Sequence, residues 1–412
     1  VAPYKSVVSQ GFTLDGQGRK MSKSLGNVID PNEVCATNGA DVLRLWVSSV
    51  DTSTDVPCDE TILSHVGDAY RKIRNTFRFL LGELEDQFDP EADALPFDEL
   101  LPFDRLTLAH MCEVHDAVSR AYEGYRFNAV YRTLYDYVTE LSNGYLNATK
   151  DRMYCDERGS RGRRSAQTVW AQVLSMLVHD LQPILVYTTD EAMEFMPAAL
   201  RDGQDFAALL DWYRNPVEEG AWRPLLPTYR ALGEVRGAFT KAFEEAKDAG
   251  VVTEQSTQAA RAVLSVPAEP FALLSQSACD LAEVFVCSEV ELRPSDELSC
   301  VVAPADGEIR WTDPAPLIER RVRGVTPAPG ARTLYEGVRL RLGPVELVPE
   351  VDDLPPGWIR VARHEVLAGT GSCAVRLGEV APAGRKWMTA DAWARGARPP
   401  ADAVLGEQGE GL

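Results

Sequence analysis

Two lysines and two serines lie within a short stretch near the N-terminus, and glycines stand on both sides of them. The stretch reads Gly18-Arg19-Lys20-Met21-Ser22-Lys23-Ser24-Leu25-Gly26-Asn27. A loop of this composition can close over a polyphosphate, because lysine supplies mobile positive charge while hydroxyl and backbone N–H groups donate hydrogen bonds. In nucleotidyl transfer, positive charge beside the leaving pyrophosphate lowers the barrier. A bare K-x-S-K would favour a solvated surface loop instead, but this longer stretch predicts a phosphate-binding loop.

The segments after this loop predict mostly helices. Asp30, Pro31 and Glu33 form a helix start, with the aspartate as cap and the proline at the first helical position, and the helix should run to about Ser48. Across residues 62–84, apolar side chains recur every three or four positions, as on the buried face of an amphipathic helix. Similar patterns follow, so we predict an all-helical bundle.

The C-terminal part has a different texture. Strands at 262–266 and 284–290, around a helix at 271–281, predict a small α/β unit. After residue 304, proline and glycine recur between short β-rich runs, which is typical of a small antiparallel barrel. The predicted segments are 1–50 with the lysine- and serine-rich loop, 51–215 as the bundle, 216–303 as the α/β unit, 304–396 as the barrel and 397–412 as a disordered tail.

Composition limits the classes of function. The 412 residues carry a net charge of −20, which argues against a protein dedicated to nucleic-acid binding through a basic face. No run of about 20 apolar residues indicates a membrane span, so we expect no membrane partner. The eight cysteines form no C-x-x-C pair, and such scattered thiols indicate a reducing cytoplasm.

The stretch from Gly18 to Asn27 resembles the KMSKS loop of class I aminoacyl-tRNA synthetases, and we refer to it as the KMSKS-like loop. Its surroundings are similar to bacterial isoleucyl-tRNA synthetases. This second resemblance is carried by Pro3-Tyr4-Lys5, Gly11-Phe12-Thr13-Leu14-Asp15, the run from Gly39 to Val47, the run from Tyr70 to Gly82, Asp151-Arg152, Arg163-Arg164-Ser165 and Pro183-Ile184-Leu185. It extends to about Gly307.

This resemblance implies a role for each part of the chain. Lys23 would contact ATP, with Mg²⁺ accompanying the nucleotide, and Lys20 would be the second catalytic residue. Met21, Ser22 and Ser24 would complete the ATP-binding loop. The bundle would be an anticodon-binding domain for isoleucine tRNA, and the first 50 residues would end a catalytic domain. The family's HIGH motif, amino-acid pocket and editing domain would precede the loop, so we expect a fragment that alone forms no isoleucyl-adenylate.

Beyond Gly307 the chain is similar to the C-terminal domain of methionyl-tRNA formyltransferase. The similarity is carried by Asp306-Gly307-Glu308-Ile309-Arg310-Trp311, Ile318 to Arg323, Gly369-Thr370-Gly371 and Met388 to Gly396. It implies an OB-like barrel that helps to hold initiator methionine tRNA. Isoleucyl enzymes often carry a cysteine-paired zinc ribbon here, which this sequence lacks, so we expect no zinc site. Two explanations fit the junction near Gly307: a fusion of two genes, or the joining of two unrelated sequences during sequence assembly.

Basic side chains in three places are candidates for contacts with tRNA phosphates. In each place the alternative is a solvated or ion-paired basic surface. The candidates are the loop residues Arg158, Arg161, Arg163 and Arg164, the helical stripe Arg71, Lys72, Arg74 and Arg78, and the C-terminal residues Arg320, Arg321, Arg323, Arg385 and Lys386.

We therefore predict a mainly α chain with a helical-bundle anticodon-binding domain, a small α/β unit and a C-terminal OB-like β-barrel. Its N-terminus would be the remnant of a class I nucleotide-binding fold. The predicted function is that of part of an isoleucine–tRNA ligase. The alternatives are a non-catalytic tRNA-binding module and a fusion to the formyltransferase C-terminal domain.

Overall fold

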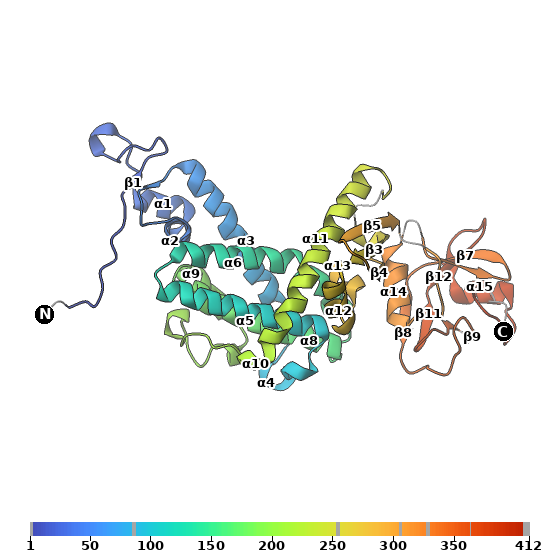
Figure 1. Ribbon diagram of the computed structural model, residues 1–412. Helices are drawn as coiled ribbons and strands as arrows, with labels where there is room; N and C mark the ends of the chain where they lie inside the picture. The colour runs from blue at the N-terminus through green and yellow to red at the C-terminus, as the bar shows by residue number, and fades with distance from the viewer. Residues whose placement is uncertain are drawn as a thin grey trace. The chain divides into compact units, whose positions relative to one another are not determined.

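The computed structural model describes residues 3–84, 88–252, 256–304, 307–326, 330–362 and 364–406. The chain divides into two compact units, Val1–Arg230 with Ser277–Cys279, and Ala231–Gln276 with Asp280–Leu412. Helices dominate the first unit, whereas most strands belong to the second (Figure 1). The mainly helical fold with several small sheets is as predicted. Among the described helices, none combines the length and the apolar character that a membrane span requires.

The KMSKS-like loop lies between a short strand and two helices. Strand β1 (Thr13–Leu14) pairs in parallel with β2 (Val56–Pro57), and a 3₁₀ turn, η1 (Lys23–Leu25), lies inside the loop. The helix predicted from Pro31 to Ser48 is two helices, α1 (Pro31–Asn38) and α2 (Ala40–Ser49). The break falls at Gly39, whose φ of 91° is open to glycine but strained for other residues.

The rest of the first unit is a helical bundle built around one buried helix. That helix, α8 (Arg161–Leu181), is buried along almost its whole length after Ser165, and it packs against α3, α5, α7 and α9. The other elements are α3 (Glu60–Leu84), α4 (Pro90–Asp93), η2 (Phe97–Glu99), α5 (Pro102–Glu123), α6 (Phe127–Asn143), α7 (Tyr145–Cys155), α9 (Val186–Phe195), η3 (Ala198–Leu200), η4 (Ala207–Leu209), α10 (Glu219–Trp222) and η5 (Arg223–Leu225).

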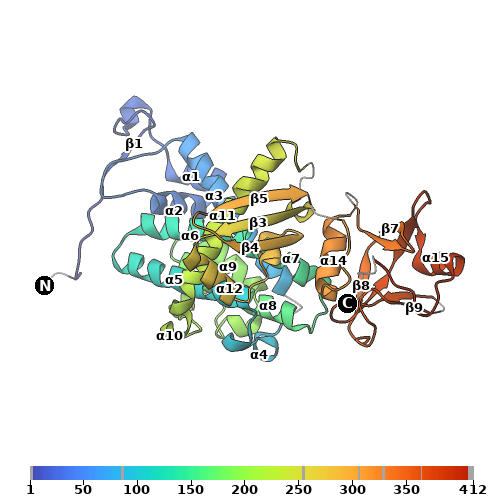
Figure 2. The same cartoon turned by 45° about the vertical axis from the view of Figure 1, so that its right-hand side comes forward.

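The second unit begins within α11 (Leu226–Asp248) and contains a three-stranded sheet (Figure 2). Strand β3 (Ala260–Val266) lies between β4 (Glu289–Pro294), which is parallel to it, and β5 (Ser299–Pro304), which is antiparallel. The remaining elements here are η6 (Thr257–Ala259), α12 (Ala268–Gln276) and α13 (Leu281–Phe285).

The strand predicted at 284–290 is wrong in its position. Val284 and Phe285 close α13, and β4 starts only at Glu289. Asp280 starts this helix, because its carboxylate accepts hydrogen bonds from the N–H groups of Ala282 and Glu283. The cap therefore outweighs the β propensity of the apolar run that follows it.

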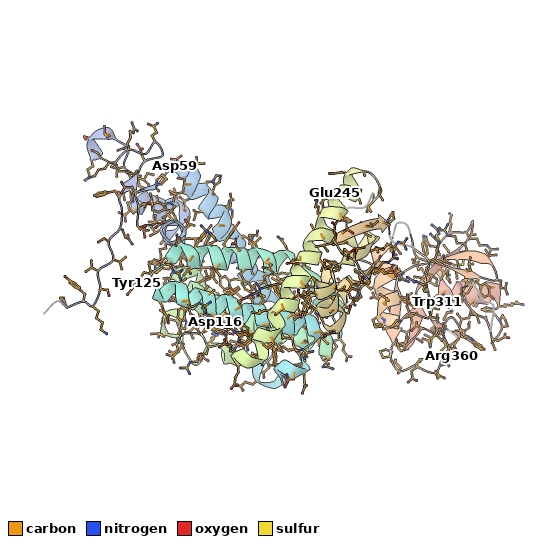
Figure 3. All side chains as sticks on the ribbon, in the orientation of Figure 1. Asp59, Asp116, Tyr125, Glu245, Trp311 and Arg360 are labelled. Atoms are coloured by element: carbon orange, nitrogen blue, oxygen red, sulfur yellow. The ribbon has the colours of Figure 1, made fainter. Side chains whose placement is uncertain are left out.

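The C-terminal strands form two four-stranded antiparallel sheets. One has the order β8 (Val345–Val348), β11 (Ala374–Leu377), β10 (Val366–Ala368), β9 (Ile359–Val361); the other has the order β13 (Met388–Thr389), β12 (Glu379–Pro382), β7 (Val338–Leu342), β6 (Arg332–Tyr335). Helices α14 (Ala315–Gly324) and α15 (Ala390–Ala397) accompany them. Trp311 belongs to this region (Figure 3) and is buried in its core. Its indole N–H donates to Thr333 Oγ1 at 2.9 Å.

Two predictions for this region need correction. The described strands form these two sheets and do not close into a single barrel. Within the predicted disordered tail, Ala403 and Leu405 are buried, and Val404 and Leu405 form bridges to Trp358 and Tyr335. This segment is ordered because its apolar side chains complete the core; residues 407–412 lie outside the described residues.

Candidate functional site

A buried aspartate closes the KMSKS-like loop. Asp15 lies at the end of β1, and its Oδ1 accepts hydrogen bonds from the N–H groups of Gln17 and Arg19 at 3.0 and 2.8 Å. Its Oδ2 accepts from Asn27 Nδ2 at 2.9 Å and from Arg19 Nε at 2.8 Å. The bond from Asn27, followed by the backbone bond from Arg19, holds the pKa of the Asp15 carboxyl well below its ordinary value. Asp15 therefore stays ionised and ties both ends of the loop together.

Asn27 completes this latch from the other end of the loop. Its Oδ1 accepts from the Ser22 N–H at 2.8 Å, and Ser22 Oγ lies 2.7 Å from Ser24 Oγ. Lys20 and Lys23 are exposed, and the Lys20 ammonium lies 4.5 Å from the centre of the exposed Phe12 ring. The latch uses the Asp15 carboxylate, the Arg19 side chain, the Asn27 carboxamide and backbone N–H groups, so both lysines remain available to an anionic ligand.

Helix α2 ties the N-terminal segment to the bundle. Asp41 Oδ2 accepts from the Thr188 N–H at 2.8 Å and from Thr188 Oγ1 at 2.6 Å, which satisfies the start of α9. Arg44 donates to the carbonyl oxygens of Pro183 and Ile184 at 2.7 and 2.8 Å. Two segments about 140 residues apart in the chain are thus joined by directed polar contacts.

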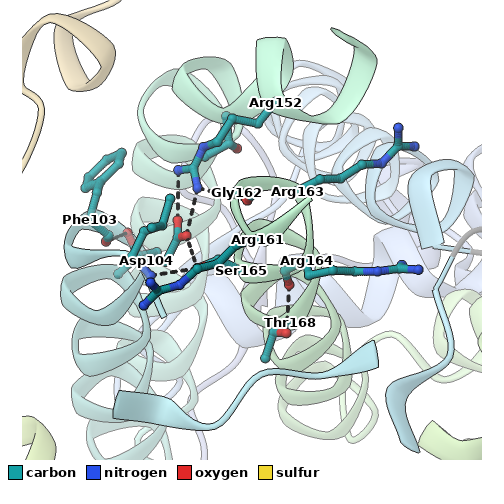
Figure 4. Close-up of polar contacts among 12 residues, drawn as sticks. Phe103, Asp104, Arg152, Arg161, Gly162, Arg163, Arg164, Ser165 and Thr168 are labelled. Carbon is teal, nitrogen blue, oxygen red and sulfur yellow. Dashed lines mark hydrogen bonds and ion pairs between the residues drawn. The ribbon is translucent and has the colours of Figure 1, made fainter. Parts of the chain in front are cut away.

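The predicted loop with Arg158, Arg161, Arg163 and Arg164, which we call the arginine-rich loop, is in part the first turn of α8, because this helix begins at Arg161. It lies beside a buried carboxylate. Asp104 is fully buried and accepts from Arg152 Nη1 and Nη2 at 2.8 and 3.0 Å, from the Tyr145 hydroxyl at 2.7 Å, and from Ser165 (Figure 4). Arg163 and Arg164 point away from Asp104 in this view. A carboxylate that is buried away from water is stable only when hydrogen-bond donors satisfy its oxygens. The donors to Asp104 come from α7 and α8.

The predicted RNA contacts of this loop differ in availability. Arg161 donates to the Glu99 carbonyl at 2.8 Å, Arg163 is buried and donates to the Asp156 carbonyl, and Arg164 pairs with Asp93 at 3.0 Å. Arg158 is exposed, and the described residues give it no ion pair. Three of the four guanidinium groups therefore brace the start of α8.

The predicted stripe on α3 is also mixed. Arg71 pairs with Asp68, and Arg74 Nη2 lies 2.6 Å from Glu191 Oε1 of α9. Lys72 lies 5.6 Å from the centre of the Tyr135 ring. Arg78 is exposed and makes no ion pair within the described ranges.

In the second unit, Arg320 and Arg321 of α14 face acidic partners. Arg320 pairs with Asp280, while Arg321 is buried and lies 3.3 Å from Glu289 and 2.9 Å from Asp313. Arg310 also pairs with Glu289, at 2.6 Å. These contacts join the segment after residue 307 to Glu289 of β4 and to Asp280, the N-cap residue of α13. They therefore fix the position of α14 beside the three-stranded sheet.

Arg385 and Lys386 belong to an exposed basic patch on the sheet that contains β7. Arg339 and Arg341 alternate with buried Leu340 on β7, and the Arg341 guanidinium lies 5.1 Å from the centre of the Trp387 ring. We call these five residues the β7 patch: Arg339, Arg341, Arg385, Lys386 and Trp387. The Ala383 N–H donates to the Arg339 carbonyl at 3.0 Å, which brings the turn after β12 beside β7. Within the described ranges, none of the four cations forms an ion pair.

Three family models match separate parts of the chain. Residues 1–59 match the model "tRNA synthetases class I (I, L, M and V)", and residues 104–264 match "Anticodon-binding domain of tRNA ligase". Residues 302–398 match "Formyl transferase, C-terminal domain".

Curated relatives give the same result for the first part. The isoleucine–tRNA ligase of Desulforudis audaxviator is 44% identical over 301 residues, which are 72% of this chain and 31% of that protein. The ligase of Geobacillus kaustophilus is 41% identical over 318 residues, 74% of this chain and 34% of that protein. This chain resembles part of an isoleucine–tRNA ligase. It spans about a third of the length of these relatives, and the comparisons confirm both resemblances seen in the sequence.

Among solved structures, the chain is similar to LeuRS of Agrobacterium radiobacter K84 in a ternary complex with tRNA and LeuAMS, and the superposition covers 53% of this chain and 24% of the LeuRS chain. The TM-score is 0.41 and the sequence identity is 21%.

Two features of the structure were not predicted from the sequence. Asp15 and Asn27 stand in stretches that carry the resemblance, but nothing in their spacing shows that they bond to each other. The β7 patch did have a signal, since Val338-Arg339-Leu340-Arg341-Leu342 alternates as a strand with one basic face.

A buried chain of Ser119, His115 and Asp180 has the residue types of a hydrolytic triad. His115 Nδ1 lies 2.9 Å from Asp180 Oδ1, but Ser119 Oγ lies 3.4 Å from His115 Nε2 and accepts from Trp212 Nε1 at 3.0 Å. Burial raises the pKa of Asp180. Because the Ser119–His115 distance is long and the rings of Trp212 and Tyr213 pack against His115, we assign this cluster to the packing of the bundle.

Proposed function

We propose that this chain supplies the phosphate-contacting loop and the tRNA-binding surfaces of an isoleucine–tRNA ligase. The observation that supports it is the Asp15–Asn27 latch, which fixes the KMSKS-like loop while Lys20 and Lys23 stay exposed. A fixed loop with mobile charges can stabilise the pyrophosphate that leaves when ATP activates isoleucine. The ordering cost of the loop is met before ATP arrives.

Each loop residue has a defined task in this proposal. Lys23 neutralises the ATP phosphates, and Lys20 does so after leaving the Phe12 ring. Ser22 and Ser24 add hydroxyl donors, while Met21 is half-buried and anchors the loop. The described residues contain no group of three or more His, Cys, Asp or Glu side chains that would hold a metal ion. Mg²⁺ therefore has no fitting site among the described side chains, and we place it on the phosphates of ATP.

The partner in this proposal is isoleucine tRNA, bound through the anticodon-binding domain. The β7 patch favours a second contact with RNA, because it combines an exposed aromatic ring with four cations that form no ion pair in the described part of the chain. We propose that the two C-terminal four-stranded sheets represent an OB-like domain. This domain would bind initiator methionine tRNA less tightly than the chain binds isoleucine tRNA. Eight free cysteines suit the reducing cytoplasm, where we place the chain.

Competition between tRNAs tests this proposal. The chain is titrated with isoleucine tRNA at about 50 and 200 mM salt, with initiator methionine tRNA and an unrelated elongator tRNA as competitors. We expect isoleucine tRNA to bind most tightly, with an affinity that falls steeply with salt because counterions are released. Equal affinity for all three would leave a tRNA-binding module without ligase specificity, and no binding would refute both functions.

ATP titration tests the loop separately. The expected result is weak ATP binding that Lys23→Ala lowers by about tenfold, since one phosphate contact of roughly 1.4 kcal/mol is lost. Lys150→Ala is the matched control, because Lys150 is an exposed lysine of α7 outside the loop. Equal effects of the two substitutions would contradict the role of Lys23.

A further inference from the structure

A cavity of about 380 Å³ opens between α3 and α9 of the bundle. Its floor is apolar, with Phe77, Leu81 and Ala192 all buried. Gly82 also lines it, and a Cβ added at this glycine would meet nothing within 4 Å. The cavity contains no residue of the KMSKS-like loop or of the β7 patch, so neither site explains it.

The rim of this cavity is aromatic and charged. The Phe195 side chain is 46% exposed although it is a large hydrophobic ring. Arg74 and Glu191 both line the cavity and pair with each other at 2.6 Å, and both remain partly exposed. Arg78 is exposed, and it has no ion pair within the described ranges. The rim thus offers a ring face, a carboxylate acceptor and an uncommitted positive charge.

This combination fits a ligand with one flat ring and one anionic group. The volume is near the lower end of the roughly 300–1,000 Å³ of ligand pockets, so it admits a single base and no helix. A ring stacks on Phe195, and its amino groups donate to Glu191. A phosphate then reaches Arg78, because a planar guanidinium binds two phosphate oxygens together.

We propose that the α3–α9 cavity binds a single nucleotide. The nucleotide has two sources, a free mononucleotide or a base turned out of a bound RNA strand, and the second source rests on the proposed tRNA binding. An apolar side chain from a partner protein would fill the floor but leave Arg78 and Glu191 unused. A nucleotide uses the floor and the rim together, which is why the cavity favours it.

Three substitutions test the cavity. Gly82→Leu fills it from α3 and also raises helix propensity, so the helix is kept. Phe195→Ala removes the ring, whereas Phe195→Tyr keeps it. Arg78→Gln removes the charge. The matched controls are Gly237→Leu on α11, Phe206→Ala for an exposed phenylalanine, and Arg120→Gln for an exposed helical arginine without an ion pair in the described part of the chain.

The full chain is titrated with AMP, with inorganic phosphate and with isoleucine tRNA. AMP binding that Gly82→Leu, Phe195→Ala and Arg78→Gln each weaken at least about tenfold, while Phe195→Tyr and the controls do not, supports the free nucleotide. Loss of tRNA affinity of the same size in the same variants, without AMP binding, supports the RNA base.

Other outcomes overturn the proposal. If AMP does not bind and the variants keep the tRNA affinity of the unaltered chain, the cavity binds no nucleotide, while the tRNA proposal survives. If AMP binds as inorganic phosphate does and Phe195→Ala changes nothing, the site recognises phosphate alone. If the unaltered chain binds neither tRNA nor AMP, the proposed function and this inference both fail.

Discussion

The arginine-rich loop of the bundle and the β7 patch look alike in sequence and differ in the structure. Both contain closely spaced cations: Arg158, Arg161, Arg163 and Arg164 in the loop, and the two pairs Arg339/Arg341 and Arg385/Lys386 in the patch. In the loop, Arg161 and Arg163 donate to backbone carbonyls and Arg164 pairs with Asp93. In the patch, Arg339 and Arg341 have no carboxylate partner among the described residues, and they face solvent.

The difference shows that the geometry around a cation decides whether it can bind RNA. A guanidinium already bonded within the chain must give up those bonds before it contacts a phosphate. An exposed guanidinium on a strand gives up only water and counterions, whose release favours RNA binding. We therefore expect stability to depend on the loop and tRNA affinity to depend on the patch.

The largest effect should come from the buried charge beside the loop. Arg152→Met leaves the Asp104 carboxylate buried without its main partner. We expect the first unit to lose about 3–5 kcal/mol of unfolding free energy, measured by urea denaturation of the full chain. Arg158→Met, an exposed arginine nearby, should change it by about 0.5 kcal/mol or less. Equal effects would mean that the Asp104 cluster is not the centre of this region.

Removing charge from the patch should affect RNA binding and leave the fold unchanged. The double variant Arg339→Gln/Arg341→Gln should weaken tRNA binding by about tenfold to a hundredfold at low salt. It should also lower the slope of log K against log salt by about 2, one for each lost phosphate contact. Titration at several salt concentrations measures both quantities. An unchanged slope would show that these arginines do not contact phosphates.

The aromatic member of the patch should contribute less. Trp387 is 45% exposed, and Arg341 covers part of its ring. We expect Trp387→Ala to cost about 1 kcal/mol of tRNA binding, or roughly fivefold, at the low end for a stacked base. Trp387→Phe should restore most of it. A loss of the same size in both variants would favour a packing role for the indole.

The loop arginines should give the opposite profile. Arg161→Gln/Arg164→Gln should lower the unfolding free energy by about 1–2 kcal/mol, since backbone and ion-pair contacts at the start of α8 are lost. Its tRNA affinity should stay within about twofold of the unaltered chain. A tenfold loss of tRNA affinity with unchanged stability would break the comparison between the two regions.

The sequence predicts the parts of the fold that depend on local periodicity. Residues 62–84 repeat apolar side chains every three or four positions, and they form α3. The break at Gly39 and the late start of β4 depend on one glycine conformation and one cap. Nearby residues determine both the break and the start of the strand. The same residues are also compatible with a continuous helix or an earlier strand, so the boundaries predicted from the sequence were wrong.

The site depends on longer distances along the chain. The KMSKS-like loop is recognisable because its chemistry lies within ten adjacent residues. The partners of Asp104 come from residues 41 to 61 positions away, and Arg74 pairs with a glutamate 117 positions away. No pattern of spacing specifies such pairs. The sequence therefore locates the arginines but does not show which of them bond to other groups within the chain.

The KMSKS-like loop contains, within one short segment, both a side chain that is bonded within the chain and a side chain that is exposed to solvent. Asp15 is bonded within the chain, as the bundle arginines are, whereas Lys23 is exposed, as the patch arginines are. The hydrogen bonds to Asp15 lower the pKa of its carboxyl, so they stabilise the loop most at pH values above about 4, the pKa of a free aspartate. That stabilisation is lost as pH falls from there through the lowered pKa.

Asn27→Ala tests this account with the smallest expected change. It removes the first of the bonds to Asp15, so the pKa of the Asp15 carboxyl should rise towards its ordinary value, and the loop should open at higher pH. NMR titration of the Asp15 carboxyl carbon and of the Ser22 amide follows both events. Asn32→Ala is the control, because Asn32 lies in α1 and does not bond to Asp15. If Asn27→Ala leaves the Asp15 pKa unchanged and the loop closed, the bonds from Gln17 and Arg19 are enough to hold Asp15, and Asn27 does not close the loop.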